Sequence, residues 1–242
     1  MSDLWPDPVA GAPYTSLSLA HLALGSAARE TADFARGLVP TGAGRGGYDG
    51  ALLADALRIA ELAEQVLAAA VVVEREDGTT WEEIGAVLGV TRSSAHKRWQ
   101  PVAQRWNEQM ERAAVRGRVD DEGLPEVLAD PPGLVARRLD EWVVRHREAG
   151  DPVAGEHPVS DALERMNPLR ELLHLEGVRR QLWASSEGAP PPALLAPLAE
   201  REAELEEALA KAAPPNDAGE HAAAAAKARA YAAQLRGQAT PN

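Results

Sequence analysis

Apolar residues recur every three or four positions along most of this chain, which is the spacing that places them on one face of an α-helix. No segment shows the strict alternation of apolar and polar residues that marks a half-buried strand. We therefore expect an all-α fold. The pattern predicts helices over residues 15–38, 50–76, 132–149, 159–185, 193–212 and 217–237, and Pro168 is expected to break or kink the one over 159–185.

The predicted helix over residues 50–76 has the broadest apolar face. Leu53, Leu57 and Ala60 follow one side of it, and Ile59 widens the face. A face this broad is buried on two sides or shared with a partner. The last two predicted helices have narrow faces made mostly of alanine and are joined by a short proline-containing turn. They predict a closely packed helical hairpin or coiled coil at the end of the chain.

Proline and glycine divide the sequence into three regions. Residues 1–49 form an arm, a helix and a glycine-rich linker, residues 50–117 a central domain, and residues 118–242 a helical carboxy-terminal region. The linker sequence over residues 41–47 lacks the Lys and Ser/Thr of a phosphate-binding loop and follows no strand. We interpret it as a flexible connection.

The most specific local signals begin near residue 80. Thr80 followed by Glu83 is a capping box, which starts a short helix over residues 81–88. Gly85 has no side chain, so another helix can approach the short helix closely at that point. The segment therefore predicts a short helix built for close packing.

A turn and a second helix follow. Gly89 can adopt the left-handed conformation that ends a helix, Val90 is expected as an apolar plug, and Thr91 can cap a helix over residues 92–99. Pro101 is well placed to begin a further helix that runs to about residue 116. Two short helices are therefore expected to cross at a tight turn, with small or apolar residues on the sides that face each other: Ile84, Val87, Leu88, Ala95 and Trp99.

The segment Trp-Glu-Glu-Ile-Gly-Ala-Val-Leu-Gly-Val-Thr-Arg-Ser-Ser-Ala-His-Lys-Arg-Trp over residues 81–99 resembles the helix-turn-helix of small actinobacterial DNA-binding proteins. It is also similar to the promoter-reading fourth region of sigma factors and to the helix-turn-helix of resolvase-type recombinases. The resemblance covers about residues 50–115. It implies binding to double-stranded DNA. Arg98 departs from the pattern, because many such domains have an aliphatic core residue there, and Trp99 is the candidate replacement.

The distribution of charge agrees with a polyanion site at this place. The chain carries a net charge of −12, yet residues 91–118 contain seven basic and two acidic residues. Residues 1–90 and 119–242 are both acidic. A solvated helix face is the ordinary explanation of such a basic segment, and the accompanying motif favours a DNA-binding surface instead.

Four residues of the second helix are candidates for contacts to bases. Arg92 is expected to reach the O6/N7 edge of a guanine with its planar guanidinium. Ser93 and His96 are expected to contact base edges or bridging waters, and Lys97 a base or a phosphate.

Five more residues are candidates for contacts to the DNA backbone. Thr80, Thr91 and Ser94 can offer hydroxyls or helix-start amides to phosphates. Arg98 and Arg105 are expected to hold the backbone beside the groove.

Other chemistry finds little support in the sequence. The chain has no cysteine and no His-Glu-x-x-His motif, and Glu171 with His174 lacks the further carboxylates of a di-iron site, so we expect no metal and no cofactor. No nucleophile motif is present, and we expect no enzyme. Trp142 and Trp183 are expected in the core, or else along a small-molecule pocket.

The sequence also predicts a location and a source. The chain has no run of 18 apolar residues, and its start lacks the basic and apolar regions of a signal peptide, so we expect a cytoplasmic protein with no membrane contact. The excess of Arg over Lys, together with abundant Ala and Gly, is typical of a high-GC genome such as that of an actinobacterium.

These observations predict a sequence-specific DNA-binding protein, in particular a transcriptional regulator that inserts the helix over residues 92–99 into the major groove. A homodimer is expected, with the helix over 50–76 or the hairpin over 193–237 as interface, and a protein partner can bind the carboxy-terminal region. The alternative is an adaptor module in which the helix-turn-helix serves as scaffold. A nucleic-acid enzyme anchored by this domain is a third possibility.

Overall fold

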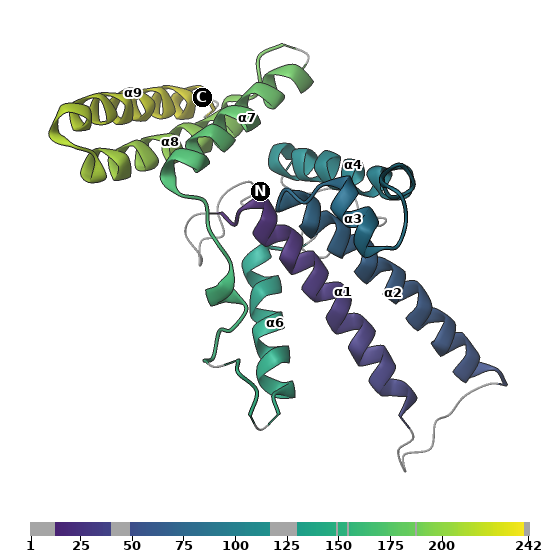
Figure 1. Cartoon of the computed structure of the whole chain (residues 1–242). Helices are drawn as coiled ribbons and strands as arrows, with labels where there is room; N and C mark the ends of the chain where they lie inside the picture. The colour runs from purple at the N-terminus through teal and green to yellow at the C-terminus, as the bar shows by residue number, and fades with distance from the viewer. Residues whose placement is uncertain are drawn as a thin grey trace. The chain divides into compact units, whose positions relative to one another are not determined.

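The computed structural model describes residues 13–39, 49–116, 130–148, 150–153, 155–186 and 188–239, with the side chains of 111–116 and 239 left aside. Every regular element in these ranges is a helix, which confirms the predicted all-α class (Figure 1). The chain divides into two compact units. Residues 1–12, 40–48 and 117–129 lie outside the described residues, and they include the expected glycine-rich linker over 41–47 and most of the expected arm.

The amino-terminal unit comprises residues 14–110 and 120–164. Its frame is an antiparallel pair of long helices, α1 (Ser16–Leu38) and α2 (Ala51–Glu76), with α6 (Pro132–His146) packed on α1 (Figure 1). Thr15 caps α1, because its hydroxyl oxygen accepts a hydrogen bond from the amide of Ser18 at 3.2 Å. Buried side chains from these three helices form one core, which includes Leu22, Val72, Val135 and Leu139, and Trp106 joins it from a later helix.

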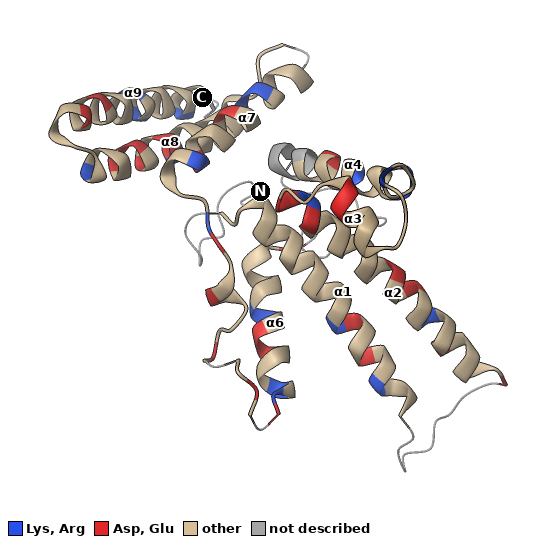
Figure 2. Cartoon of the chain, in the orientation of Figure 1, with Lys and Arg blue, Asp and Glu red and all other residues tan. Residues whose placement is uncertain are grey.

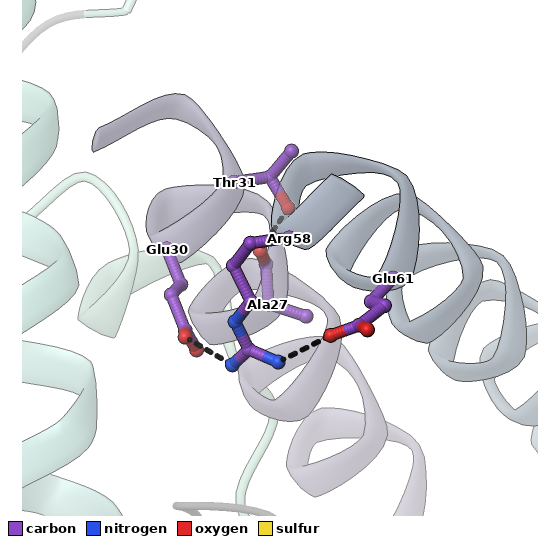
Figure 3. Close-up of polar contacts among 5 residues, drawn as sticks. All are labelled: Ala27, Glu30, Thr31, Arg58 and Glu61. Atoms are coloured by element: carbon purple, nitrogen blue, oxygen red, sulfur yellow. Dashed lines mark hydrogen bonds and ion pairs between the residues drawn. The ribbon is translucent and has the colours of Figure 1, made fainter. Parts of the chain in front are cut away.

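A charged cluster joins α1 and α2 near their solvent-exposed ends. The guanidinium of Arg58 donates to Glu30 of α1 at 3.1 Å and to Glu61 of its own helix at 3.2 Å (Figure 3). The two carboxylates raise the pKa of Arg58 above its ordinary value. Because all three side chains are exposed, this cluster contributes little to stability.

Two further helices pack on the carboxy-terminal half of α2. They are α3 (Trp81–Val87) and α4 (Arg92–Arg116). The prediction of separate helices over 92–99 and from Pro101 onward was wrong, because α4 continues through Pro101. Proline costs a helix one hydrogen bond. Trp99 and Trp106 are both buried, one on each side of that proline, so packing holds the two halves in one helix.

The segment over residues 159–185, where Pro168 was expected to break or kink the helix, is two elements. A 3-10 helix, η1 (Ser160–Ala162), closes the amino-terminal unit, and α7 (Pro168–Ser185) begins the other. Pro168 is the first residue of α7, where its missing amide costs nothing, and Asn167 caps the helix. The buried carboxylate of Asp140 accepts from the amides of Val159 and Ser160 at 2.7 and 3.1 Å, so it fixes the segment before α7.

The carboxy-terminal unit contains α7, α8 (Pro192–Ala212) and α9 (Pro215–Ala239). Helices α8 and α9 form the expected hairpin, and alanines at 225, 228 and 232 allow them to approach closely. Leucines of all three helices complete this core: Leu175, Leu182, Leu195, Leu198, Leu205 and Leu235. The placement of Trp183 in a core was wrong, since it is 50% exposed.

One ion pair is buried in the carboxy-terminal unit. Glu171 of α7 is inaccessible to solvent, and the guanidinium of Arg201 of α8 donates hydrogen bonds to both of its carboxylate oxygens, at 2.7 and 3.1 Å.

None of the helices in the described ranges combines the length and apolar character needed to cross a membrane.

Candidate nucleic-acid interface

Helix α3 begins with the predicted capping box. The hydroxyl oxygen of Thr80 accepts from the amide of Glu83 at 3.3 Å, and Glu83 Oε2 accepts from the amide of Thr80 at 2.8 Å. The Thr80 hydroxyl also donates to that carboxylate at 2.7 Å. These bonds lower the pKa of Glu83. The carboxylate beside Thr80 repels a phosphate, so the arrangement disfavours a DNA contact through this hydroxyl.

The turn between α3 and α4 depends on two glycines. Gly89 has φ +67°, a left-handed conformation that side chains other than glycine rarely adopt. At Gly85, a Cβ atom would lie 2.9 Å from the carbonyl oxygen of Val90 and 3.2 Å from the amide of Arg92. The close approach expected at Gly85 is thus made by the backbone of the turn. The chain reverses there because Gly85 leaves room for it.

Helix α4 starts at the predicted cap. The hydroxyl oxygen of Thr91 accepts from the amide of Ser94 at 3.2 Å, and the two hydroxyls lie 3.0 Å apart. Ala95 and Trp99 are buried against Ile84 of α3 and Val71 of α2. Trp99 therefore occupies the core position that an aliphatic residue at position 98 fills in many helix-turn-helix domains.

The exposed side of the first turns of α4 carries the predicted base-contacting residues. Arg92, Ser93, His96 and Lys97 are all exposed. The structure shows no ion pair between Arg92 or Lys97 and any other described residue. This surface, Arg92–Ser93–His96–Lys97, will be called the α4 start surface.

The two other arginines lie on a different side of α4. Arg98 pairs with Glu64 of α2 at 3.1 Å, and its guanidinium carbon lies 4.7 Å from the centre of the Trp99 ring. Arg105, seven residues further along, donates from Nε to the carbonyl oxygen of Pro101 at 3.3 Å. Arg98 is thus tied to the protein by a surface ion pair, which a phosphate can replace at small cost.

Two apolar residues near the turn are exposed, contrary to expectation. Val87 is 88% exposed, although its spacing placed it on the inner face of α3. Val90 is also exposed, so its assignment as a plug was wrong. The turn is held by backbone contacts at Gly85 and by the amide of Val90, which donates to the carbonyl oxygen of Gly85 at 2.9 Å.

Some residues beside the α4 start surface were missed in the sequence. The Trp81 ring contacts the His96 ring edge-on, with centroids 5.4 Å apart, and the Arg75 guanidinium carbon lies 4.9 Å from the Trp81 centroid. Gln100 donates to Gln104 at 2.9 Å one turn further along α4. Gln100 follows Lys97 by three residues, so the two lie on neighbouring positions of one helix surface. The sequence analysis missed this because it ended the helix at residue 99, whereas α4 continues through Pro101.

Comparison with models of known protein families, with curated proteins and with solved structures finds no match for this chain.

Proposed function

We propose that this protein is a sequence-specific regulator that binds double-stranded DNA by inserting the start of α4 into the major groove. The observation that carries the proposal is the α4 start surface. Its four polar side chains are exposed on the helix that directly follows a tight glycine turn. An α-helix fits the major groove of B-DNA, and a helix presented after such a turn is the usual reading element of helix-turn-helix proteins.

The way in which α4 is held supports this role. The buried side of its first two turns is fixed by Ala95 and Trp99, so the exposed side is rigid without help from its own polar groups. Arg92 and Lys97 are then available to a ligand. A site built on a rigid helix binds more tightly than a mobile one because less ordering is required on binding, and it holds its contacting groups more precisely.

Charge supports the same surface. Among the described side chains of residues 91–110, four are basic and only Glu108 is acidic. The remainder of the chain is acidic and repels DNA, which favours binding through this one surface.

The contact to DNA can be measured by titrating labelled duplex from upstream of the protein's own gene at several salt concentrations. Affinity should fall steeply with salt as counterions are released. Lys97→Ala should reduce the slope of log K against log salt by about 1. Lys211→Ala, an exposed lysine on α8, is the matched control and should leave the slope unchanged. Affinity independent of salt, or equal slopes for both variants, would contradict the assignment.

A homodimer is part of this proposal, because a single helix-turn-helix reads only a few base pairs. Of the two expected interfaces, α2 is better supported. Leu53 and Leu57 are 67% and 60% exposed, while the apolar side of α9 is already buried against α8. The side of α2 that carries Leu53 and Leu57 continues into Leu67 and Val71, which α3 and α4 cover. Helices α3 and α4 therefore cover the carboxy-terminal part of this apolar face of α2, and the part with Leu53 and Leu57 is left exposed.

Light scattering during size-exclusion chromatography tests the dimer. The wild type should have the mass of two chains at micromolar concentration, and the double variant Leu53→Asp with Leu57→Asp should have the mass of one. Leu169→Asp with Leu173→Asp changes two equally exposed leucines on α7 and should remain dimeric. A one-chain mass for the wild type would remove the dimer from the proposal.

An adaptor function is the second candidate, and one observation favours it. Leu169, Leu173 and Trp183 are exposed on the side of α7 that faces away from its buried residues. Leu169 and Leu173 are neighbours one turn apart, and exposed neighbouring apolar side chains are typical of protein-binding surfaces. This surface can also serve a regulator that contacts a protein partner through its carboxy-terminal unit.

A further inference from the structure

The side of α7 that faces away from the core of the carboxy-terminal unit carries a stripe of exposed residues. The buried residues of α7 lie on the opposite side of the helix. The residues of the stripe follow one another at spacings of three and four, which places them on one helix face: Leu169, Leu173, Glu176, Arg180 and Trp183. Helix α7 thus has a second face, which its own unit leaves open to solvent.

The middle of this stripe is charged, and apolar residues lie on both sides of the charges. Glu176 and Arg180 lie between Leu173 and Trp183, which are 61% and 50% exposed. The structure shows no ion pair between Glu176 or Arg180 and any other described residue. The neighbouring Arg179 differs, because it pairs with Glu202 of α8. The charges of the stripe are therefore available to another molecule.

The order of these four residues is complementary to itself when it is reversed. In an antiparallel pair of α7 helices with a two-fold axis midway between Glu176 and Arg180, each of these residues faces its opposite charge on the second copy. The same axis places Leu173 of each copy opposite Trp183 of the other. A parallel pair would bring like charges together, which is unfavourable. The pattern of charged and apolar residues therefore favours the antiparallel arrangement.

Gly177, beside the middle of the stripe, is a second and independent observation. Glycine in the interior of a helix costs about 1 kcal/mol relative to alanine. A Cβ atom at this position would meet no atom within 4 Å, so packing inside the chain gives no reason for glycine. The missing side chain instead lets the backbone of another helix approach closely at the centre of the stripe.

We propose that this stripe is a self-association surface, on which a second copy of the chain packs its own α7 in antiparallel orientation. The contact joins one helix to one helix, and interfaces that bury less than about 1,200 Å² in total are typically weak and transient. We therefore expect a dissociation constant on the order of 0.1 mM. The contact is separate from the one proposed at α2, because α7 belongs to the other unit.

A consequence for DNA binding rests on the proposed function. Chains bound at neighbouring sites of one duplex raise each other's local concentration, so a contact too weak to form in dilute solution can form there. Occupancy of one site should then increase affinity at the next, and the coupling is reciprocal.

Sedimentation velocity of the full chain tests the contact itself. The parent protein for this test carries Leu53→Asp with Leu57→Asp, so that the exposed face of α2 does not contribute. Its average mass should rise from one chain toward two between about 20 and 500 µM. Glu176→Arg and Arg180→Glu, each added alone, should weaken the association at least about tenfold, because like charges then face each other.

A matched control and a mixture sharpen this test. Lys227→Glu makes the same change of charge at an exposed position of α9 and should associate as the parent does. Glu176→Arg is basic at both central positions and Arg180→Glu is acidic at both, so an equimolar mixture of the two should associate again. A parent mass independent of concentration, single variants that associate as the parent does, or a mixture that stays at the mass of one chain would overturn the proposal.

Disulfide cross-linking in air tests the antiparallel orientation, because the natural chain has no cysteine. Leu173→Cys mixed with Trp183→Cys should form a mixed disulfide between the two chains. Leu173→Cys alone should form far less, since its two copies lie about 15 Å apart along the helix axes, beyond the reach of a disulfide. Equal cross-linking of Leu173→Cys with itself would contradict the antiparallel arrangement. These measurements contain no DNA, so their outcome is independent of whether the protein binds DNA.

Discussion

The α3–α4 region and the α8–α9 hairpin use charged residues in opposite ways. In the hairpin and the adjoining α7, four arginines are paired with carboxylates: Arg179 with Glu202, Arg201 with Glu171 and Glu204, Arg229 with Glu207, and Arg236 with Glu200. Figure 2 shows acidic and basic residues close together along these helices. At the start of α4, Arg92 and Lys97 are exposed and have no such partner among the described residues.

The comparison separates charge that maintains a fold from charge that is available to a ligand. In the carboxy-terminal unit, ion pairs bridge helices whose apolar faces are narrow and rich in alanine. In the α3–α4 region, glycine, alanine and tryptophan contacts hold the helices, and the basic groups are not needed for packing. Substitutions in the two regions should therefore affect different properties.

The largest effect on stability is expected at the buried ion pair. Arg201→Met leaves the inaccessible carboxylate of Glu171 without its partner, and the carboxy-terminal unit should lose about 3–5 kcal/mol of unfolding free energy. Arg179→Met removes a half-exposed pair and should cost under about 1 kcal/mol. Urea denaturation followed by circular dichroism gives both values, and equal losses would show that burial does not set the importance of these pairs.

A smaller effect is expected at the glycine turn. Gly85→Ala places a methyl group 2.9 Å from a backbone oxygen that cannot move away easily, and should destabilise the amino-terminal unit by about 1–3 kcal/mol. Gly177→Ala is the control, because no atom lies within 4 Å of the added methyl group on α7. That change should be neutral or stabilising by up to about 1 kcal/mol in thermal unfolding. A neutral Gly85→Ala would contradict the close approach of the turn.

The smallest effect is expected from pH. Burial of His174 on α7 lowers its pKa below the ordinary value of 6.5. As the pH falls below 6.5, the unfolded chain binds a proton that the folded chain does not, so the carboxy-terminal unit loses stability. His174→Gln should reduce this loss between pH 7.5 and 5.5 in urea titrations. An unchanged pH dependence in the variant would assign it to other groups.

The helices themselves were largely predictable from the sequence, and the caps at Thr15, Thr80 and Thr91 are found where hydroxyl residues precede apolar periodicity. The errors arose where tertiary packing overrides a local signal. Pro101 indicates a helix start, yet Trp99 and Trp106 keep α4 continuous across it.

Side-chain partners were less predictable than helices. The sequence identified Arg98 as basic but gave no sign that Glu64, 34 residues earlier, pairs with it. A cavity of about 310 Å³ lined by residues that include Trp81 and Trp106 was also missed, because it forms only where α2, α3 and α4 meet. Exposure of the α4 start surface agrees with the sequence analysis, and its role in binding DNA remains the central prediction.

Selection of duplexes from a random double-stranded pool tests that prediction most directly, with wild type, Arg92→Ala and the exposed control Arg137→Ala compared at low salt. The wild type and Arg137→Ala should recover the same consensus, and Arg92→Ala should lose the preference for one guanine at a cost of about 1–3 kcal/mol in affinity. Recovery of no consensus by the wild type, or of an identical consensus by Arg92→Ala, would contradict the reading of DNA by α4.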